Sequence, residues 1–267
     1  MKRNILSVIF LCTVLLTACT ASNAGMESTA PSTLPSTTQV STETSEPETT
    51  APPTEAPTQP EHSWLYIPGL TVEDVILYFN EVCLDAEFTE SGDPSIIQKW
   101  TEPIYYSLDG LSTDTDIQVL TAFVEWLNTV DGFPGIYEAE DSTPVNLRIH
   151  FTTPEEMTAL LGDNFAGCDG GVTFWYIANE IYDADICYDI NTDQYTRNSV
   201  ILEEIYNGLG PVQDTSLRSD SIIYAEYSAP QELTEIDKLL LTLLYHPRIE
   251  CGMDAAACEA VIRELYY

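Results

Sequence analysis

A stretch of 41 residues near the N-terminus, residues 20–60, sets the main limit on what this chain can fold into. It contains 17 Ser or Thr, 7 Pro and 5 Glu, and it has no aromatic and no basic residue. Such a segment cannot bury enough apolar surface to offset the entropy lost on ordering. As a flexible coil it would span roughly 35 to 40 Å. A folded core is therefore expected only in residues 61–267, with residues 19–60 as a disordered tether.

The residues before the tether have the pattern of a secretory signal. Lys2 and Arg3 precede a twelve-residue, mostly apolar stretch at residues 5–16, which is too short to span a bilayer, since a spanning helix needs about 20 apolar residues. The run that follows, Leu16-Thr17-Ala18-Cys19, resembles a bacterial lipobox. This resemblance implies a lipoprotein signal peptide at residues 1–18 and a diacylglyceryl group on Cys19. The alternative is an ordinary signal cleaved near Ala21 or Ala24.

Lipidation would anchor the protein to a membrane without spanning it. The expected location is the bacterial cell membrane, with the folded domain facing the extracytoplasmic side. The bilayer would be one partner, through Cys19, and a ligand or protein of the cell envelope a second. The tether would act as a spacer, either for passage through a cell wall or as a plain linker.

Charge excludes one large class of partners. The chain has 9 Lys and Arg against 43 Asp and Glu, a formal net charge of −34. Phosphate backbones would repel such a chain, so nucleic-acid binding is not expected. With 44% hydrophobic and 10% aromatic residues it can still build a core, and the length of residues 61–267 suits one domain.

Five cysteines fall in the predicted domain, and an exported protein can oxidise them. Cys251 and Cys258 are close in sequence, and Cys168 and Cys187 flank a predicted hairpin, so these are the two candidate disulfides. Cys83 is then a core residue on the apolar face of a helix. The cysteine spacings match no common zinc site.

Hydrophobic periodicity predicts a mixture of helices and strands without regular βαβ alternation, which favours an α+β fold. A capping box formed by Thr71 and Asp74 opens the first helix, and Thr153 caps another that stops at Gly162. The expected helices are residues 72–83, 117–127, 154–161, 199–207, 234–245 and 254–265, and the expected strands are residues 103–108, 145–151, 172–177 and 180–190.

The helix near residue 204 carries the strongest functional signal. It reads Glu203-Glu204-Ile205-Tyr206-Asn207-Gly208-Leu209-Gly210-Pro211-Val212-Gln213-Asp214. With the order of the predicted elements and the later turn at Ile223 and Tyr224, this segment resembles the metzincin branch of the zincin metallopeptidases. The resemblance implies a zincin-like mixed sheet packed on helices, with a C-terminal helical part. It places Glu203, Asn207 and Gln213 at the three zinc-binding His positions, and Glu204 at that of the general base.

The missing histidines argue against zinc. Two carboxamides and a carboxylate form a hard oxygen site that zinc does not favour, and without a metal Glu204 has no activated water to deprotonate. His62, His150 and His246 do not replace the triad by position. We therefore expect a pseudo-metallopeptidase with no cofactor and no metal, a binding protein rather than an enzyme.

A second motif points to a narrower family. The sequence Leu244-Tyr245-His246-Pro247-Arg248-Ile249-Glu250-Cys251-Gly252-Met253, together with the Glu-Glu and Leu-Gly pattern, resembles a family catalogued as domain of unknown function 2927. That family resembles zincins with replaced zinc ligands, so it implies a fold and no activity.

Two interpretations of the helix remain open. Glu203 and Glu204 are either exposed acids in the first turn of a helix, where the helix dipole favours them, or part of a vestigial cleft, with Asn207 and Gln213, that binds a ligand or a hard cation. An alternative function is an envelope hydrolase, peptidase-like, that uses Glu204 as general base with an unorthodox metal site. A two-lobed solute receptor is disfavoured, because 207 residues are few for two lobes.

Two further patterns suggest weaker sites. Residues 189–193 have the spacing of the first calcium-loop ligands, but Gln194 stands where the loop needs Gly and Val200 where it needs Glu. Consecutive aromatics at residues 174–176 suit a sugar-stacking platform, but core packing is the favoured interpretation.

Overall fold

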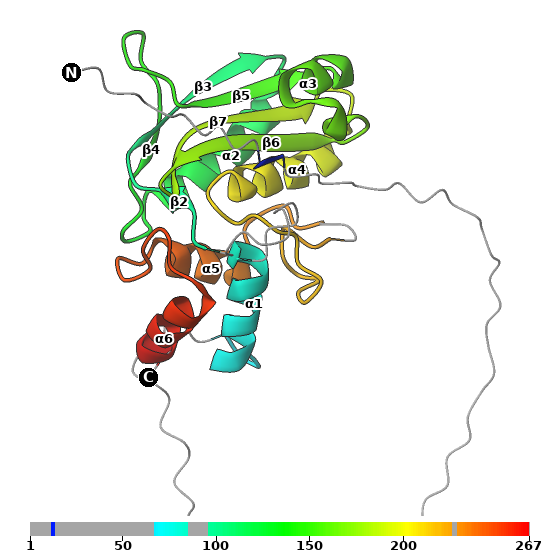
Figure 1. Ribbon diagram of the computed structural model, residues 1–267. Helices are drawn as coiled ribbons and strands as arrows, with labels where there is room; N and C mark the ends of the chain where they lie inside the picture. Colours follow the sequence, from blue (N-terminus) through cyan, green and yellow to red (C-terminus); the bar gives the residue numbers. More distant parts are fainter. Residues whose placement is uncertain (1–11, 14–66, 85–95, 226–228, 267) are drawn as a thin grey trace, which may run out of the picture.

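The computed structural model describes residues 12–13, 67–84, 96–225 and 229–266 (Figure 1). Its α-helices are α1 (Val72–Leu84), α2 (Asp114–Leu127), α3 (Pro154–Leu161), α4 (Gln194–Asn207), α5 (Glu235–Tyr245) and α6 (Ala255–Tyr266), and η2 (Asp163–Phe165) is a short 3-10 helix. Its strands are β1 (Cys12–Thr13), β2 (Lys99–Trp100), β3 (Ile104–Gly110), β4 (Ile136–Glu138), β5 (Leu147–Thr152), β6 (Gly170–Ile177) and β7 (Glu180–Asp189).

One mixed sheet joins all the strands, in the order β1-β6-β7-β5-β3-β4, with β2 also paired to β7. The pairs from β4 through β3 and β5 to β7 are parallel, whereas β6 runs antiparallel to β7. The strand β1 pairs with β6 and lies in the predicted signal peptide. Removal of residues 1–18 would therefore leave β6 at the edge of the sheet.

Helices cover the sheet on both faces. Because side chains alternate along a strand, neighbours on β7 report on opposite faces: Tyr188 donates a hydrogen bond to the Ile201 carbonyl of α4 at 3.2 Å, while Cys187 packs with Met157 and Phe165 of α3 and η2. Helix α4 contacts β6 and β7 and packs on α2. The sheet thus lies between an α2–α4 layer and a smaller α3–η2 cover.

A second group of helices lies beside the sheet. Helix α1 packs on α6, and Figure 1 shows both next to α5, below the strands. The buried Lys99 of β2 ties this group to the sheet, since its Nζ donates to the carbonyl oxygens of Leu244 at 2.7 Å and Ile249 at 2.5 Å. The predicted C-terminal helical part is therefore completed by a helix from the beginning of the domain.

The mixed sheet on helices confirms the coarse fold prediction, with two differences. The sheet is mostly parallel and has a helical crossover, β3-α2-β4, which the α+β expectation did not include. Helices α2 and α4 also begin earlier than predicted, at Asp114 and Gln194, because Thr113 and Asp193 cap them. Among the described residues, no helix is long and apolar enough to cross a membrane.

Candidate functional site

Helix α4 places Glu203 and Glu204 in its last turns. Its N-cap is Asp193, whose Oδ1 accepts hydrogen bonds from the backbone N–H groups of Tyr195 at 3.1 Å and Thr196 at 3.2 Å. The interpretation of Glu203 and Glu204 as exposed acids in a first turn is therefore wrong. The C-terminal end of a helix carries partial negative charge, which disfavours carboxylates.

Both Glu204 and Asn207 are buried, each with 2% of its surface exposed, and Glu203 is half-buried. Glu204 lies between α4 and β6. A Cβ atom added to Gly170 of β6 would come within 3.0 Å of the Glu204 Cγ. The absence of a side chain at Gly170 is therefore what allows Glu204 to fit against the sheet.

Three side-chain oxygens at this end of α4 are buried without a hydrogen-bond partner. They are Oε2 of Glu204, Oδ1 of Asn207 and Oε1 of Gln213. A buried acceptor without a donor costs about 1 to 3 kcal/mol, so native proteins usually satisfy such atoms with protein, water or ions. The three oxygens thus form a set of acceptors with no protein donor.

Burial and neighbouring acidic groups raise the pKa values of both glutamates at the site. Burial, followed by the charge of Asp214, raises the pKa of Glu204 well above its usual range. Burial also raises the pKa of Glu203, and Glu204, Asp214 and Asp169 raise it further. No ion pair in the described part of the chain includes Glu203 or Glu204. The group therefore lacks a protein cation to offset it.

The chain after α4 is held in place by neighbouring elements. Trp100 Nε1 donates to the Gly208 carbonyl at 2.9 Å, and the Tyr245 hydroxyl donates to the Leu209 carbonyl at 2.7 Å. Gly210 has a φ of +123°, and a Cβ there would lie 2.4 Å from the Gln98 carbonyl oxygen. Only glycine fits this turn, which leads the chain to Gln213.

The turn at Ile223 and Tyr224 packs beside the same segment. Thr215 N donates to the Ile223 carbonyl at 2.9 Å, and Ala225 N donates to the Thr215 carbonyl at 3.0 Å. Ile223 is fully buried and Tyr224 is half-buried. The structure thus brings the predicted turn next to the chain that carries Gln213 and Asp214.

Comparison with known proteins identifies the family. Residues 73–264 match the model of a family described as a protein of unknown function (DUF2927), which is more than half of the chain. The chain belongs to this family. Neither the curated proteins nor the solved structures include a match to it. The predicted resemblance to domain of unknown function 2927 is confirmed, and the family description gives the DUF2927 domain no activity.

The two histidines of the DUF2927 domain belong to β5 and to the C-cap of α5, not to α4 or the loop that follows it. His150 on β5 lies between two carboxylates, with Nδ1 3.7 Å from Asp109 and Nε2 3.6 Å from Asp185. The backbone N–H of Arg248 donates to His246 Nδ1 at 3.2 Å, and burial lowers the pKa of His246. His62 is outside the described residues. Within the described ranges, no group of three or more His, Cys, Asp and Glu side chains is arranged to hold a metal ion.

The calcium-like segment has a local role. Asp189 Oδ1 accepts the backbone N–H of Asn191 at 2.8 Å, and Asp193 caps α4. The aromatic run on β6 divides between core and surface, with Phe174 at 1% exposure and Trp175 and Tyr176 half-buried. These contacts account for both motifs without a ligand.

The two predicted disulfides are not formed in the structure, where Cys187, Cys251 and Cys258 are thiols. Cys168 and Cys187 nevertheless share a small apolar cluster under α3. Burial raises the pKa of Cys187 to about 12 and that of Cys258 to about 11, so neither is a reactive thiolate at neutral pH. The two pairings stay predictions for the exported protein.

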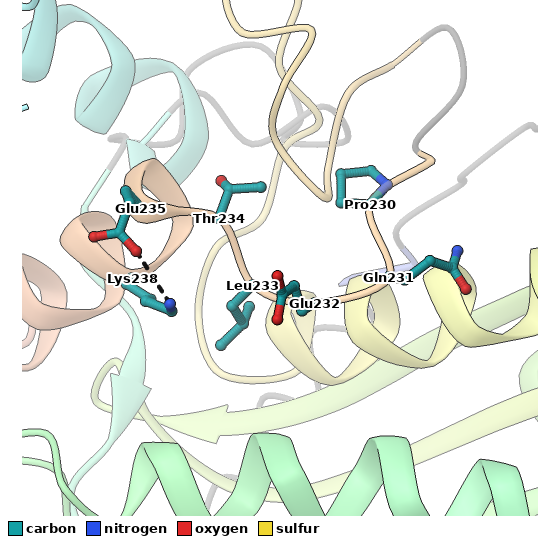
Figure 2. A pocket seen from close by; sticks show the side chains of 7 residues that line it. All are labelled: Pro230, Gln231, Glu232, Leu233, Thr234, Glu235 and Lys238. Carbon is teal, nitrogen blue, oxygen red and sulfur yellow. Dashed lines mark hydrogen bonds and ion pairs between the residues drawn. The ribbon is translucent and has the colours of Figure 1, made fainter. Parts of the chain in front are cut away.

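An open pocket of about 550 Å³ lies at the start of α5 (Figure 2). Three of its polar side chains have partners within the protein: Lys238 Nζ lies 3.2 Å from Glu235, and Gln231 Nε2 donates to Ser199 Oγ at 2.9 Å. None of the residues predicted from sequence as a site lines it. The pocket is lined by Pro230, Gln231, Glu232, Leu233, Thr234, Glu235 and Lys238.

Cys19 is outside the described residues. Of the predicted site, the structure therefore locates Glu203, Glu204, Asn207 and Gln213 around the end of α4. Sequence reasoning did not include Gly170 or Asp169, because they precede or open a strand far from α4 in the chain. No periodicity could have found them, since only the pairing of β6 with β7 brings them to the helix.

Proposed function

We propose that this DUF2927 protein is a lipid-anchored extracytoplasmic binding protein, with a degenerate zincin-like domain at the end of a flexible tether. Cys19 would carry the diacylglyceryl group, and residues 20–60 would separate the domain from the bilayer. The ligand would bind at the C-terminal end of α4. This domain would act as a pseudo-metallopeptidase, without zinc and without catalysis.

The arrangement around α4 supports the zincin-like part of the proposal. The antiparallel strand β6, which would be at the edge of the sheet once residues 1–18 are removed, is followed by β7 and then by the helix that carries Glu203, Glu204 and Asn207. A glycine turn at Gly210 leads to Gln213. The resemblance places the three zinc ligands of active metzincins at Glu203, Asn207 and Gln213 and the general base at Glu204, and none of these residues is a histidine.

One observation carries the binding function: the unpartnered oxygens of Glu204, Asn207 and Gln213. Three oxygens that accept no hydrogen bond from the protein suit a ligand that donates hydrogen bonds, or a cation. Retaining such a set in a core is costly, so its presence favours a binding role over a purely structural one.

A hydrolase remains a second candidate because of one property of Glu204. Its raised pKa brings a carboxyl group closer to the range in which it can exchange protons with a substrate near neutral pH. This function would also need a metal ion or another group to activate water. A peptidase-like enzyme of the cell envelope would therefore lose all turnover in Glu204→Gln.

The test of the proposed function combines metal content with turnover. The purified full-length protein is analysed by elemental mass spectrometry and incubated with a library of peptides and envelope glycans, beside Glu203→Ala and Glu204→Gln. We expect no stoichiometric zinc and no turnover. Near-stoichiometric zinc that disappears in Glu203→Ala, or hydrolysis that disappears in Glu204→Gln, would replace the binding protein with an enzyme.

A further inference from the structure

We propose that the ligand at the end of α4 is a hard divalent cation of the calcium type, held by side-chain oxygens of Glu204, Asn207 and Gln213. This inference rests on the proposed function, because it specifies the ligand of that same site.

The first argument is the geometry of α4. Glu204 and Asn207 are three residues apart, so they lie on the same face of the helix. Both are 2% exposed, and each has one oxygen without a partner. Two buried oxygens on one helix face that accept no hydrogen bond from the protein are suited to ligate a cation.

The second argument is the position of the loop that follows. Val212 N donates to the Val82 carbonyl at 2.9 Å, which fixes the backbone just before Gln213. The adjacent Asp214 is close enough to Glu204 for its charge to act on that carboxyl group. The loop therefore holds Gln213 beside a residue whose charge reaches Glu204, and Gln213 contributes a third oxygen without a partner.

The third argument concerns the kind of ion. Every available ligand atom is a carboxylate or carboxamide oxygen, which suits calcium, magnesium and manganese and disfavours zinc and copper. Calcium accepts six to eight oxygens in irregular arrangements and readily uses Asn and Gln carbonyls, whereas magnesium needs a near-ideal octahedron and retains water. A buried site with several protein oxygens from a helix and a loop therefore favours calcium.

The charge of the proposed ligand set limits the affinity for the ion. The described residues offer no triad of His, Cys, Asp and Glu that could hold a metal ion, and two of the three proposed ligands are carboxamides. The affinity should then be modest, with a Kd of roughly 10⁻⁴ to 10⁻³ M as in extracellular calcium modules, because few full charges face the ion.

The experiment is a calcium titration of the full-length protein, purified in detergent and freed of metal with a chelator. Isothermal calorimetry with calcium chloride measures stoichiometry and Kd, and a thermal melt measures the shift in Tm. We expect one calcium per chain and a Tm that rises with calcium concentration. Magnesium should bind at least ten-fold more weakly, and zinc should not bind at this site.

Two variants and one control assign the site. Glu204→Gln and Gln213→Leu should each weaken calcium binding at least ten-fold. Gln213 is on a loop and half-buried, so this variant should fold even if changes on α4 do not. Glu155→Gln, on the exposed face of α3, is the matched charge control and should bind as the wild type does.

Three results separate the inference from the function on which it rests. No saturable calcium binding by the folded wild-type protein, or equal binding by wild type and both variants, would overturn the calcium assignment. If zinc and turnover are also absent, the proposed binding function stands with another ligand. Stoichiometric zinc or hydrolysis would overturn both.

Discussion

At the scale of single residues, Gly170 decides whether α4 can approach the sheet. A Cβ at this position would lie 2.4 Å from Val200 Cγ1 and 3.0 Å from Glu204 Cγ. Gly170→Ala should therefore push α4 away from β6 and destabilise the domain by about 1 to 3 kcal/mol. Urea unfolding measures the loss, and the calcium titration should show weaker binding because Glu204 has moved.

The control for this change is Gly167→Ala. Gly167 has a φ of +88° and open space around its Cβ position, so alanine there costs about 1 to 2 kcal/mol in backbone strain alone. It should leave ligand binding unchanged. A Gly170→Ala protein as stable as the wild type would show that α4 is not held tightly against the strand.

A second residue, Lys99, should be important for stability rather than for binding. Its Nζ donates to two carbonyl oxygens, of Leu244 and Ile249, and lies 5.4 Å from the centre of the Tyr245 ring. Lys99→Met would leave both carbonyls buried without a donor, and we expect a loss of about 3 kcal/mol in the free energy of unfolding. Chemical denaturation measures this loss.

The control for Lys99 is Lys238→Met, which removes a surface pair with Glu235 and should change stability little. A similar loss of stability in both variants would contradict the role assigned to Lys99.

At the scale of elements, a buried ion pair joins the N-terminal ends of α2 and α4. Arg197 Nε lies 2.9 Å from Asp116 Oδ1, and both side chains are almost fully buried. Burial would raise the pKa of Asp116, but hydrogen bonds from Arg197, Thr113 and Gln194 outweigh it and lower the pKa. Asp116→Asn leaves the Arg197 charge buried without its partner, so we expect a loss of about 3 kcal/mol at pH 7.

The pH dependence of that loss has a definite sign. Because the folded-state pKa of Asp116 lies below its unfolded value of about 3.9, its contribution is present above that value and is lost as pH falls through the folded pKa. The gap between wild type and Asp116→Asn should therefore be full at pH 7 and shrink below about pH 4. Unfolding curves across this range test it, with Asp114→Asn on the exposed face of α2 as control. A gap that stays constant down to pH 2 would contradict it.

The same elements show what sequence could predict. The capping boxes at Thr71 and Thr153 fixed two helix starts correctly, because a side-chain cap is a local signal. Asp193 was missed as the cap of α4, since it was considered only as a calcium ligand. The predicted start of this helix was therefore five residues too late, so Glu203 and Glu204 were assigned to its first turn although they lie in the last turns of α4. The burial of Glu204 then could not be predicted.

At the scale of the whole molecule, the sequence predicted which segments form helices and strands, but it did not predict which distant segments contact one another. The family, the mixed sheet and the helical C-terminal part were predicted from motifs and periodicity. The packing of α1 on α6 and of α4 on Gly170 was not, because each depends on partners 30 or more residues away. The site is composed of such contacts, so only its α4 and loop residues were predictable.

The largest-scale prediction concerns where the domain is held. If Cys19 carries a diacylglyceryl group, two acyl chains anchor the protein durably, because each buried methylene contributes about 0.8 kcal/mol. In bacterial cells grown with labelled palmitate, the wild type should take up label and sediment with membranes. The Cys19→Ala protein should take up no label and should no longer sediment with membranes.

Cys12→Ala is the matched control, because Cys12 is the other cysteine of the predicted signal segment. It should keep the label, which shows that lipid attaches at Cys19 and not at any N-terminal thiol. A wild-type protein that is unlabelled, with a mature N-terminus near Ala21 or Ala24, would mean an ordinary signal. Without the lipid anchor, the domain would be released from the cell surface. The ligand that binds at the end of α4 would then have to be sought in the surroundings of the cell.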